Sequence, residues 1–159
     1  MSTPMVIILM GSRADLDHST KIADACNGFG LDTVLRIASA HKTPEHALSI
    51  LKEFEADARP KVYITVAGRS DALSGFTDGF VGAPVIACPP PSDVFGGADV
   101  YSSLRMPSGI APAVVLEPFN AALLAAKILS LVNIEIQDQV RLNQKRAAEK
   151  IIEDDASVR

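Results

Sequence analysis

The stretch VIILM, residues 6–10, is an unbroken apolar run near the start of the chain. A strand that is covered on both faces of a parallel sheet has such a run, whereas a strand with one wet face alternates apolar and polar residues. The polar stretch GSRAD follows at residues 11–15, where a strand of this length ends. Together they predict a buried parallel strand and a polar turn, which is the first unit of an α/β fold.

Apolar runs and helical spacing alternate through the rest of the chain. Strands are predicted at residues 6–10, 33–38, 61–67, 84–88 and 113–116. Helices are predicted at residues 14–29, from Pro44 onward, and at 71–79, 98–105, 120–132 and 135–155. Five strand units joined by helices predict a parallel sheet with helices on both faces, followed by a long, charged C-terminal helix.

The composition suits one domain over residues 1–159 and argues against several classes of partner. The net charge of −4 and the pI near 5.3 leave no basic surface for nucleic acid. No apolar run approaches the roughly 20 residues that span a bilayer, and the N-terminus lacks the charged region of a signal peptide. We therefore expect a cytoplasmic protein. Cys26 and Cys88 are far apart without a CxxC partner, so we expect no disulfide, and the three histidines lack paired ligand spacing, so we expect no structural metal. His18 and His46 fall on predicted helices, and we expect both at the surface.

Polar turns follow four of the predicted strands. They are GSRAD at residues 11–15, SAHK at 39–42, GRSD at 68–71 and PPPS at 89–92. The carboxyl ends of parallel strands meet at one rim of the sheet, and the ligands of such sheets bind beyond that rim. We therefore expect these turns to form a single ligand site.

The turn within IASAHKTPEH, residues 37–46, carries the most informative side chains. Structural turns usually contain Gly, Asn or Asp, but this one offers the hydroxyl of Ser39, the imidazole of His41 and the ammonium of Lys42. Such a set can hold an anion and move a proton near neutral pH. The alternative for His41 is a structural histidine, and the alternative for Lys42 is a solvated surface charge.

Further rim residues have both a functional and a structural interpretation. Gly11 and Ser12 open a helix whose free N–H groups can bind an anion, although an ordinary N-cap is the simpler interpretation of this pair alone. Asp15 either complements the helix dipole or accepts hydrogen bonds from ribose hydroxyls. Arg69, after Gly68, either binds an anion or forms a surface ion pair. The sequence has no Walker, Rossmann or nucleophile-elbow motif.

The order of the motifs is more specific than any one of them. GSRAD, SAHKTPEH, AGRSD and SSLRMPSGIAP follow one another along the chain. The set resembles the aminoimidazole ribonucleotide carboxylase family of purine biosynthesis, over about residues 6–127. The resemblance implies a flavodoxin-like, three-layer αβα fold and an octameric assembly. It also implies a lyase that places a carboxylate on C4 of the aminoimidazole ring of a ribonucleotide, with no metal, biotin or ATP.

The family has two branches, and the motif variants distinguish them. A mutase branch moves a carboxylate from the N5 nitrogen and typically carries SAHR and an AGxAAHLPG stretch. The other branch takes CO2 directly and carries SAHK, AGRS, a CPP loop and SLRxPSG, as this chain does. The resemblance therefore implies reversible carboxylation of 5-aminoimidazole ribonucleotide with CO2 to 4-carboxy-5-aminoimidazole ribonucleotide in de novo purine (IMP) biosynthesis. One departure is Asp71, where that branch commonly has Asn, and it leaves open whether this position contacts the CO2 pocket.

Two other functions remain as alternatives. The nearer one is the N5-carboxyaminoimidazole ribonucleotide mutase. The more distant one is a non-catalytic, flavodoxin-like nucleotide-binding module, such as a receiver. A receiver needs clustered acidic residues at the end of its first strand, but this strand ends in Met10, Gly11 and Ser12.

The resemblance also implies a role for each motif. His41 would be the acid/base catalyst, Asp15 would contact the ribose, and the turn at 68–70 would approach the ring and the carboxylate. Ser108 and Gly109 would close the site from a neighbouring subunit. The expected substrate-binding residues are Gly11, Ser12, Asp15, Ser39, Ala40, Lys42, Gly68, Arg69, Ser70, Ser108 and Gly109, with Ser12, Ser39 and Lys42 on the 5′-phosphate.

A homo-oligomer is expected from the hydrophobic pattern itself. The predicted helix at 120–132 is apolar almost all the way round, whereas a surface helix needs a polar face. Its apolar residues, among them Leu123, Leu124, Ile128 and Leu131, cannot all reach one core. The octamer is an implication of the resemblance alone.

Overall fold

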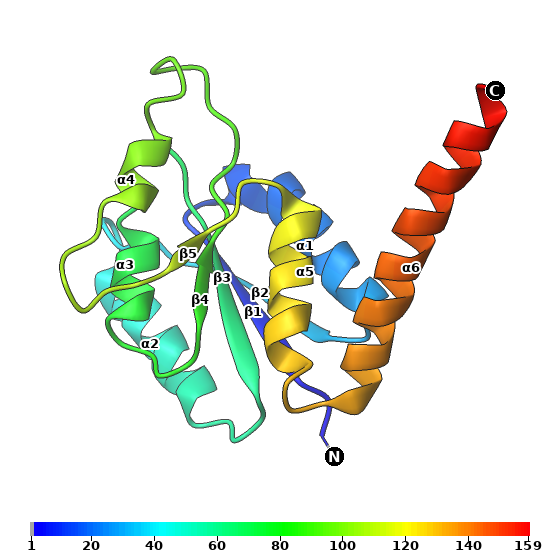
Figure 1. Ribbon diagram of the computed structural model, residues 1–159. Coiled ribbons are helices and arrows are strands. Elements are labelled where there is room, and N and C mark those ends of the chain that lie inside the picture. Colours follow the sequence, from blue (N-terminus) through cyan, green and yellow to red (C-terminus); the bar gives the residue numbers. More distant parts are fainter. Residues whose placement is uncertain (1) are drawn as a thin grey trace.

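Five parallel strands form one sheet at the centre of the molecule (Figure 1). The computed structural model describes residues 2–159, and Met1 of the expected domain lies outside the described residues. The strands pair in the order β2-β1-β3-β4-β5, which is a flavodoxin-like order and confirms the predicted parallel sheet. They are β1 (Met5–Met10), β2 (Asp32–Ile37), β3 (Lys61–Val66), β4 (Val85–Ala87) and β5 (Ala113–Val114).

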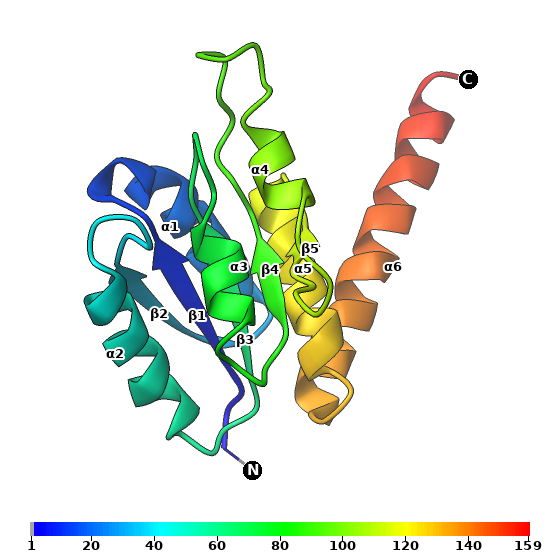
Figure 2. The ribbon, with the colours of Figure 1, turned by 90° about the vertical axis from the view of Figure 1, so that its left-hand side faces the viewer.

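Helices cover both faces of the sheet, as predicted (Figures 1 and 2). Successive residues of β1 alternate between two cores, one shared with α1 and α5 and the other with α2 and α3. All six side chains of β1 are buried, which is why this run of sequence contains no polar residue. The helical elements are the 3₁₀ turn η1 (Arg13–Asp15), α1 (Leu16–Gly28), α2 (Pro44–Glu55), α3 (Leu73–Asp78), α4 (Val100–Leu104), α5 (Pro118–Leu129) and α6 (Ile134–Ser157).

The apolar helix α5 presents small side chains to the core. Four of its alanines have no exposed surface, so α5 can approach the sheet and α1 closely. Leu123, Leu124 and Ile128 are partly buried against the same core, and these three side chains therefore reach it. Leu131 does not, because it lies in the turn after α5 and is 83% exposed.

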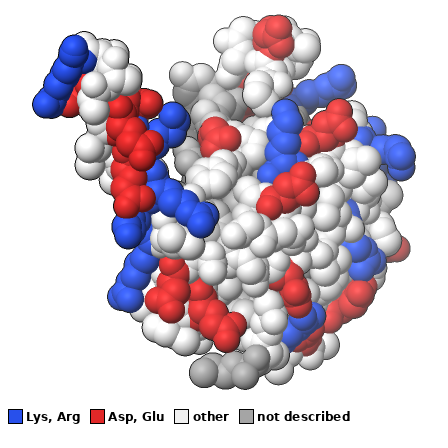
Figure 3. Space-filling view, turned by 90° about the vertical axis from the view of Figure 1, so that its right-hand side faces the viewer, with Lys and Arg blue, Asp and Glu red and all other residues white. Residues whose placement is uncertain are grey.

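The C-terminal helix α6 leaves the body of the molecule (Figure 1). It begins after Asn133, whose side-chain oxygen accepts a hydrogen bond from the N–H of Ile136 at 3.0 Å. Ile136 and Val140 are buried, whereas every residue from 144 onward is exposed. Acidic and basic side chains lie along the projecting part (Figure 3), so the predicted long, charged helix is confirmed. No helix of the described chain is both long and apolar enough to cross a membrane.

His18 is not the free surface residue that the sequence analysis expects. It is partly buried on α1, and its Nε2 lies 3.4 Å from Sγ of Cys88, just beyond β4. Burial lowers the pKa of His18 and raises the pKa of the Cys88 thiol to about 12, so both groups are neutral at pH 7. The contact joins α1 to the carboxyl end of β4. His46 is exposed as expected, and Cys26 and Cys88 are both free.

We expect His18 to make the fold less stable in mild acid. An unfolded histidine takes up a proton near pH 6.5, whereas folded His18 does so only at a lower pH. Its contribution to stability is therefore complete above pH 6.5 and is lost as the pH falls through the folded pKa. Between pH 7 and pH 5, the free energy of unfolding of His18→Gln, measured with urea, should fall less steeply than that of the parent.

The exposed His46 provides the matched control for this measurement. The variant His46→Gln should keep the parent's dependence on pH. Equal slopes for the parent and both variants would contradict the role given to His18.

Candidate active site

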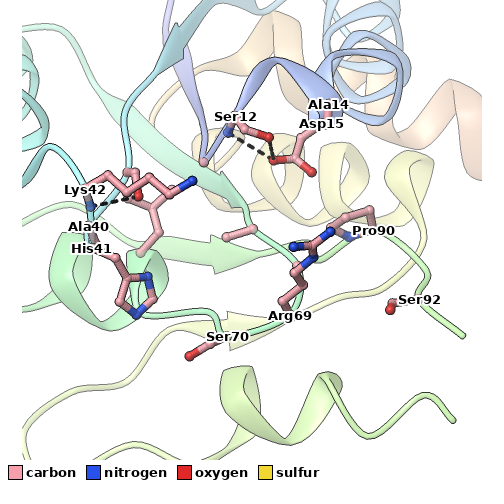
Figure 4. A pocket seen from close by; sticks show the side chains of 15 residues that line it. Ser12, Ala14, Asp15, Ala40, His41, Lys42, Arg69, Ser70, Pro90 and Ser92 are labelled. Carbon is pink, nitrogen blue, oxygen red and sulfur yellow. Dashed lines mark hydrogen bonds between the residues drawn. The ribbon is translucent and has the colours of Figure 1, made fainter. Parts of the chain in front are cut away.

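A cleft of about 470 Å³ lies beyond the carboxyl ends of β1, β2 and β3 (Figure 4). The turns that follow these three strands form most of its wall, so the predicted rim exists. Of the residues expected to bind substrate or transfer protons, all but Ser108 and Gly109 line this one cleft. They are Gly11, Ser12, Asp15, Ser39, Ala40, His41, Lys42, Gly68, Arg69 and Ser70.

Five further residues of the cleft were not predicted as site residues. Four are apolar, and a lone apolar residue beside a turn has no chemical signature in a sequence. Ser92 and Pro90 belong to the fourth polar turn, which is expected at this rim. The five are Ala14, Ala67, Leu73, Pro90 and Ser92.

The turn after β1 is organised around the carboxylate of Asp15. Asp15 Oδ2 accepts hydrogen bonds from the backbone N–H of Ser12 at 3.1 Å and from the Ser12 hydroxyl at 3.3 Å. This is the N-cap arrangement that the sequence left as the simpler alternative, and it occupies the Ser12 amide that an anion would use. The second carboxylate oxygen, Oδ1, has no hydrogen-bond partner in the described chain, so Asp15 can still accept hydrogen bonds from a ligand.

The turn after β2 holds its shape through hydrogen bonds between Ser39 and the next residues. Ser39 Oγ accepts the N–H of Lys42 at 3.1 Å, and Thr43 Oγ1 accepts the N–H of Ser39 at 2.9 Å. The backbone N–H groups of Ala40 and His41 have no partner within residues 2–159. The side chains of His41 and Lys42 are exposed at the cleft and form no ion pair there. This turn therefore offers free N–H groups, an ammonium and an unpaired imidazole at one place.

The turn after β3 places Arg69 at the cleft in a rare backbone conformation. Its φ of 60° is the only positive φ of a non-glycine residue in the described chain. The guanidinium forms no ion pair within residues 2–159, and Figure 4 shows the side chain reaching into the cleft. Of the two alternatives for Arg69, the surface ion pair is therefore absent, and a cation is available for an anionic ligand.

Asp71 does not line the cleft. It is only 4% exposed and lies behind the turn, where it accepts three hydrogen bonds. The donors are the N–H of Ser74 at 3.0 Å, the Ser74 hydroxyl at 2.7 Å and the Ser103 hydroxyl at 2.7 Å. Asp71 thus secures the start of α3, as the predicted helix start at this residue implies, and fixes α3 to α4.

Ser108 and Gly109 lie outside the cleft of their own chain. The loop that carries them packs on α3, where a Cβ added to Gly75 would lie only 3.0 Å from Sδ of Met106. The N–H of Ala111 also donates to Asp78 Oδ2 at 2.7 Å, which ties the end of this loop to α3. Because the loop is held there, Ser108 and Gly109 remain exposed and do not line the cleft.

The cleft combines groups that suit an anionic ligand carrying hydroxyls. Lys42 and Arg69 supply positive charge, Asp15 supplies an acceptor for hydroxyl groups, and His41 supplies an imidazole that can act as an acid or a base. Ala67, Leu73 and the neighbouring apolar residues provide a surface for a flat ring. No cluster of His, Cys, Asp and Glu suited to a metal ion occurs in the described part of the chain.

Comparisons with known proteins agree on one family. Residues 5–150 match the family described as AIR carboxylase. A Treponema denticola protein named phosphoribosylaminoimidazole carboxylase is 63% identical over 156 residues, which is 98% of each chain. An Archaeoglobus fulgidus protein of the same name is 53% identical and covers 96% of this chain and 84% of its own. The crystal structure of Treponema denticola PurE matches with a TM-score of 0.97 at 63% identity, over 98% of this chain and 99% of that one.

Proposed function

We propose how the cleft works from the premise that this chain belongs to the AIR carboxylase family. It is an enzyme that carboxylates 5-aminoimidazole ribonucleotide (AIR) in purine biosynthesis, and the reverse reaction is that of a carboxy-lyase. The assignment of residues to steps is our proposal, and so is CO2 as the direct carboxyl donor. One observation carries the assignment of residues: His41, Lys42, Arg69 and Asp15, from three different turns, meet in a single cleft.

The turn after β2 holds the 5′-phosphate. Lys42 supplies the charge. The unpartnered N–H groups of Ala40 and His41 can donate hydrogen bonds to a phosphate oxygen. The Ser39 hydroxyl, which accepts the N–H of Lys42 and keeps its own proton, completes this grip, and the Ser12 hydroxyl joins it once it turns from Asp15 to the phosphate. Asp15 Oδ1 accepts hydrogen bonds from the ribose, so the nucleotide is fixed at two points and its ring lies over the turn that carries His41.

The ring chemistry then needs one base and a cationic partner for the new carboxylate. The 5-amino group makes C4 of AIR electron-rich, and C4 donates an electron pair to the carbon of CO2 to form the new C–C bond. C4 now carries both a proton and the carboxylate. His41 removes that proton, which restores the aromatic ring, and Gly68, Arg69 and Ser70 face the carboxylate. In the reverse direction the imidazolium returns the proton to C4 and CO2 leaves.

The mutase is the second candidate, because it forms the same 4-carboxylated product from the N5-carboxylated form of the same ribonucleotide. The observation that favours the CO2-using branch is the joint presence of Lys42, Arg69 and Ser70 in the cleft. These residues belong to the SAHK and AGRS motifs that the CO2-using branch carries. Purified enzyme should form the 4-carboxylated product from AIR and bicarbonate, which supplies CO2, without added N5-carboxylated substrate. Turnover with the N5-carboxylated compound alone would assign the mutase reaction instead, and tight nucleotide binding without any turnover would favour a binding module.

The proton step and the binding step should separate in two neighbouring variants. His41→Asn keeps a polar side chain but cannot transfer the proton, so kcat should fall by about 10²- to 10⁴-fold while the KM for AIR changes little. Lys42→Ala removes a charge that holds the phosphate in both ground and transition states, so KM should rise with kcat less affected. Steady-state kinetics of both variants tests the assignment. If His41→Asn turns over within a few-fold of the parent, His41 is only a turn residue.

We also propose that one domain, over residues 1–159, assembles into a homo-oligomer, with an octamer as the expected size. Leu131, Ile151 and Ile152 are exposed by 83%, 68% and 69%, which leaves apolar surface for a second copy. The loop with Ser108 and Gly109 is held away from its own cleft, which suits a role at a neighbour's cleft. A cytoplasmic location fits the two free cysteines.

Sedimentation velocity at micromolar concentration should show a species much larger than the 16.8 kDa chain. A single species of monomer mass would contradict the assembly. Mixing two inactive variants tests whether the loop with Ser108 completes the cleft of a neighbouring subunit. His41→Asn chains mixed with Ser108→Asp chains should regain activity, because some sites of the mixed oligomers combine an intact His41 with an intact loop. Mixtures that form common oligomers yet stay inactive would exclude a loop contribution from a neighbour.

A further inference from the structure

Arg69 adopts a backbone conformation that needs an external restraint. Its φ of 60° lies in the left-handed region, which an arginine rarely enters because its Cβ then crowds the backbone. Such a residue keeps this conformation only where its surroundings determine it. Arg69 is also exposed, so packing of its side chain does not supply the restraint.

The restraint comes from Asp99, which lies thirty positions further along the chain at the start of α4. Asp99 Oδ2 accepts a hydrogen bond from the backbone N–H of Arg69 at 3.0 Å. A carboxylate acceptor makes this bond stronger than one to a neutral group. Asp99 thus contacts Arg69 through its backbone N–H and forms no ion pair with its guanidinium.

Two serines of α4 fix Asp99 and the turn to each other. The Ser102 hydroxyl donates to the carbonyl oxygen of Asp99 at 2.7 Å and accepts the N–H of Asp71 at 2.9 Å. The Ser103 hydroxyl donates to Asp71 Oδ2 at 2.7 Å, and both of these groups are buried. Asp99 therefore holds Arg69 directly, and Ser102 and Ser103 hold Asp71 two residues further along the same turn.

This arrangement leaves the charge of Arg69 available. The guanidinium has no carboxylate partner in the described chain, and it reaches into the cleft (Figure 4). The Ser39–Lys42 turn already serves the phosphate, so the anion left for Arg69 is the carboxylate that the reaction adds to the ring. Asp99 itself does not line the active cleft but an adjoining hollow that shares Gly68, Pro90 and Ser92 with it. Its hydrogen bond to the catalytic turns is the one to the Arg69 amide, and its effect is therefore expected to act through Arg69.

We propose that Asp99 is a positioning residue that holds Arg69 in the left-handed conformation, from which its guanidinium binds the transferred carboxylate. The inference rests on the proposed function of the cleft. It adds that α4, a helix outside the catalytic turns, sets the geometry of the carboxylate site. In this arrangement the buried Asp71 anchors α4 through its hydrogen bond with Ser103.

The test compares two substitutions of Asp99 in the full-length enzyme. Asp99→Ala removes the acceptor, so the KM for the 4-carboxylated nucleotide in decarboxylation should rise and kcat of carboxylation should fall, each by about 10- to 100-fold. The KM for AIR should stay within about threefold, because the phosphate grip is intact. Asp99→Asn keeps an oxygen that can accept the same N–H, so it should stay within a few-fold of the parent. Asp93→Ala, on the exposed part of the same loop, is the matched control and should be unchanged.

A double-mutant cycle decides whether Asp99 acts through Arg69. In an Arg69→Ala background, the further change Asp99→Ala should have little effect on kcat/KM. Independent, multiplicative losses would overturn the proposal, as would parent-like kinetics of Asp99→Ala or an Asp99→Asn variant as damaged as the alanine one. Should Asp99→Ala fold poorly, Asp99→Ser takes its place with the same expected losses, because the serine hydroxyl is too short to reach the Arg69 amide. A parent enzyme inactive with AIR and bicarbonate would instead refute the proposed function, so the two failures are distinguishable.

Discussion

Parallel pairing on both sides of β1 is the constraint on which the rest of the structure depends. The last residue of β1, Met10, lies opposite Ile37 at the end of β2 and opposite Val66 at the end of β3. The three strands therefore end at the same level, and the three turns that follow are brought to one edge of the sheet. Residues 11–15, 39–42 and 67–70 are far apart in the sequence, but this register makes them walls of the same cleft. The catalytic geometry is in this sense a consequence of strand register.

The placement of acceptors within the turns determines the charge of the cleft. Asp15 and Asp99 each accept a backbone N–H, from Ser12 and Arg69 respectively, and neither forms an ion pair with Lys42 or Arg69. The carboxylates near the cleft thus shape its backbone without neutralising its cations. A chain with a net charge of −4 can in this way keep a site that attracts a phosphate and a second carboxylate.

The sequence was informative wherever a local pattern determines the structure. Continuous apolar runs located the strands, and the polar turns at strand ends predicted which segments meet at the rim, because strand direction alone brings those turns together. The resemblance to the family then assigned ten residues of the cleft within those turns. The sequence could not reveal contacts between distant side chains and backbone groups. The Asp99–Arg69 bond spans thirty residues, and the contact of His18 with Cys88 spans seventy, and neither leaves a periodic trace. Ser108 was assigned to the site by its motif, but the packing of Met106 against Gly75 holds its loop on α3.

The projecting end of α6 implies a gradient of local opening along a single helix. Its inner end is secured by Ile136 and Val140 in the core, whereas its outer part is supported by ion pairs one turn apart, such as Lys145 with Glu149 and Lys150 with Asp154. Pairs of this kind add only about 0.3–0.5 kcal/mol each, and a short helical segment without packing is marginal in water. In an isolated chain the outer amides would fray and exchange their hydrogens with solvent long before the inner ones do. A second copy packed along this segment would remove the difference, so the hydrogen-exchange pattern of one helix would report whether the chain has assembled.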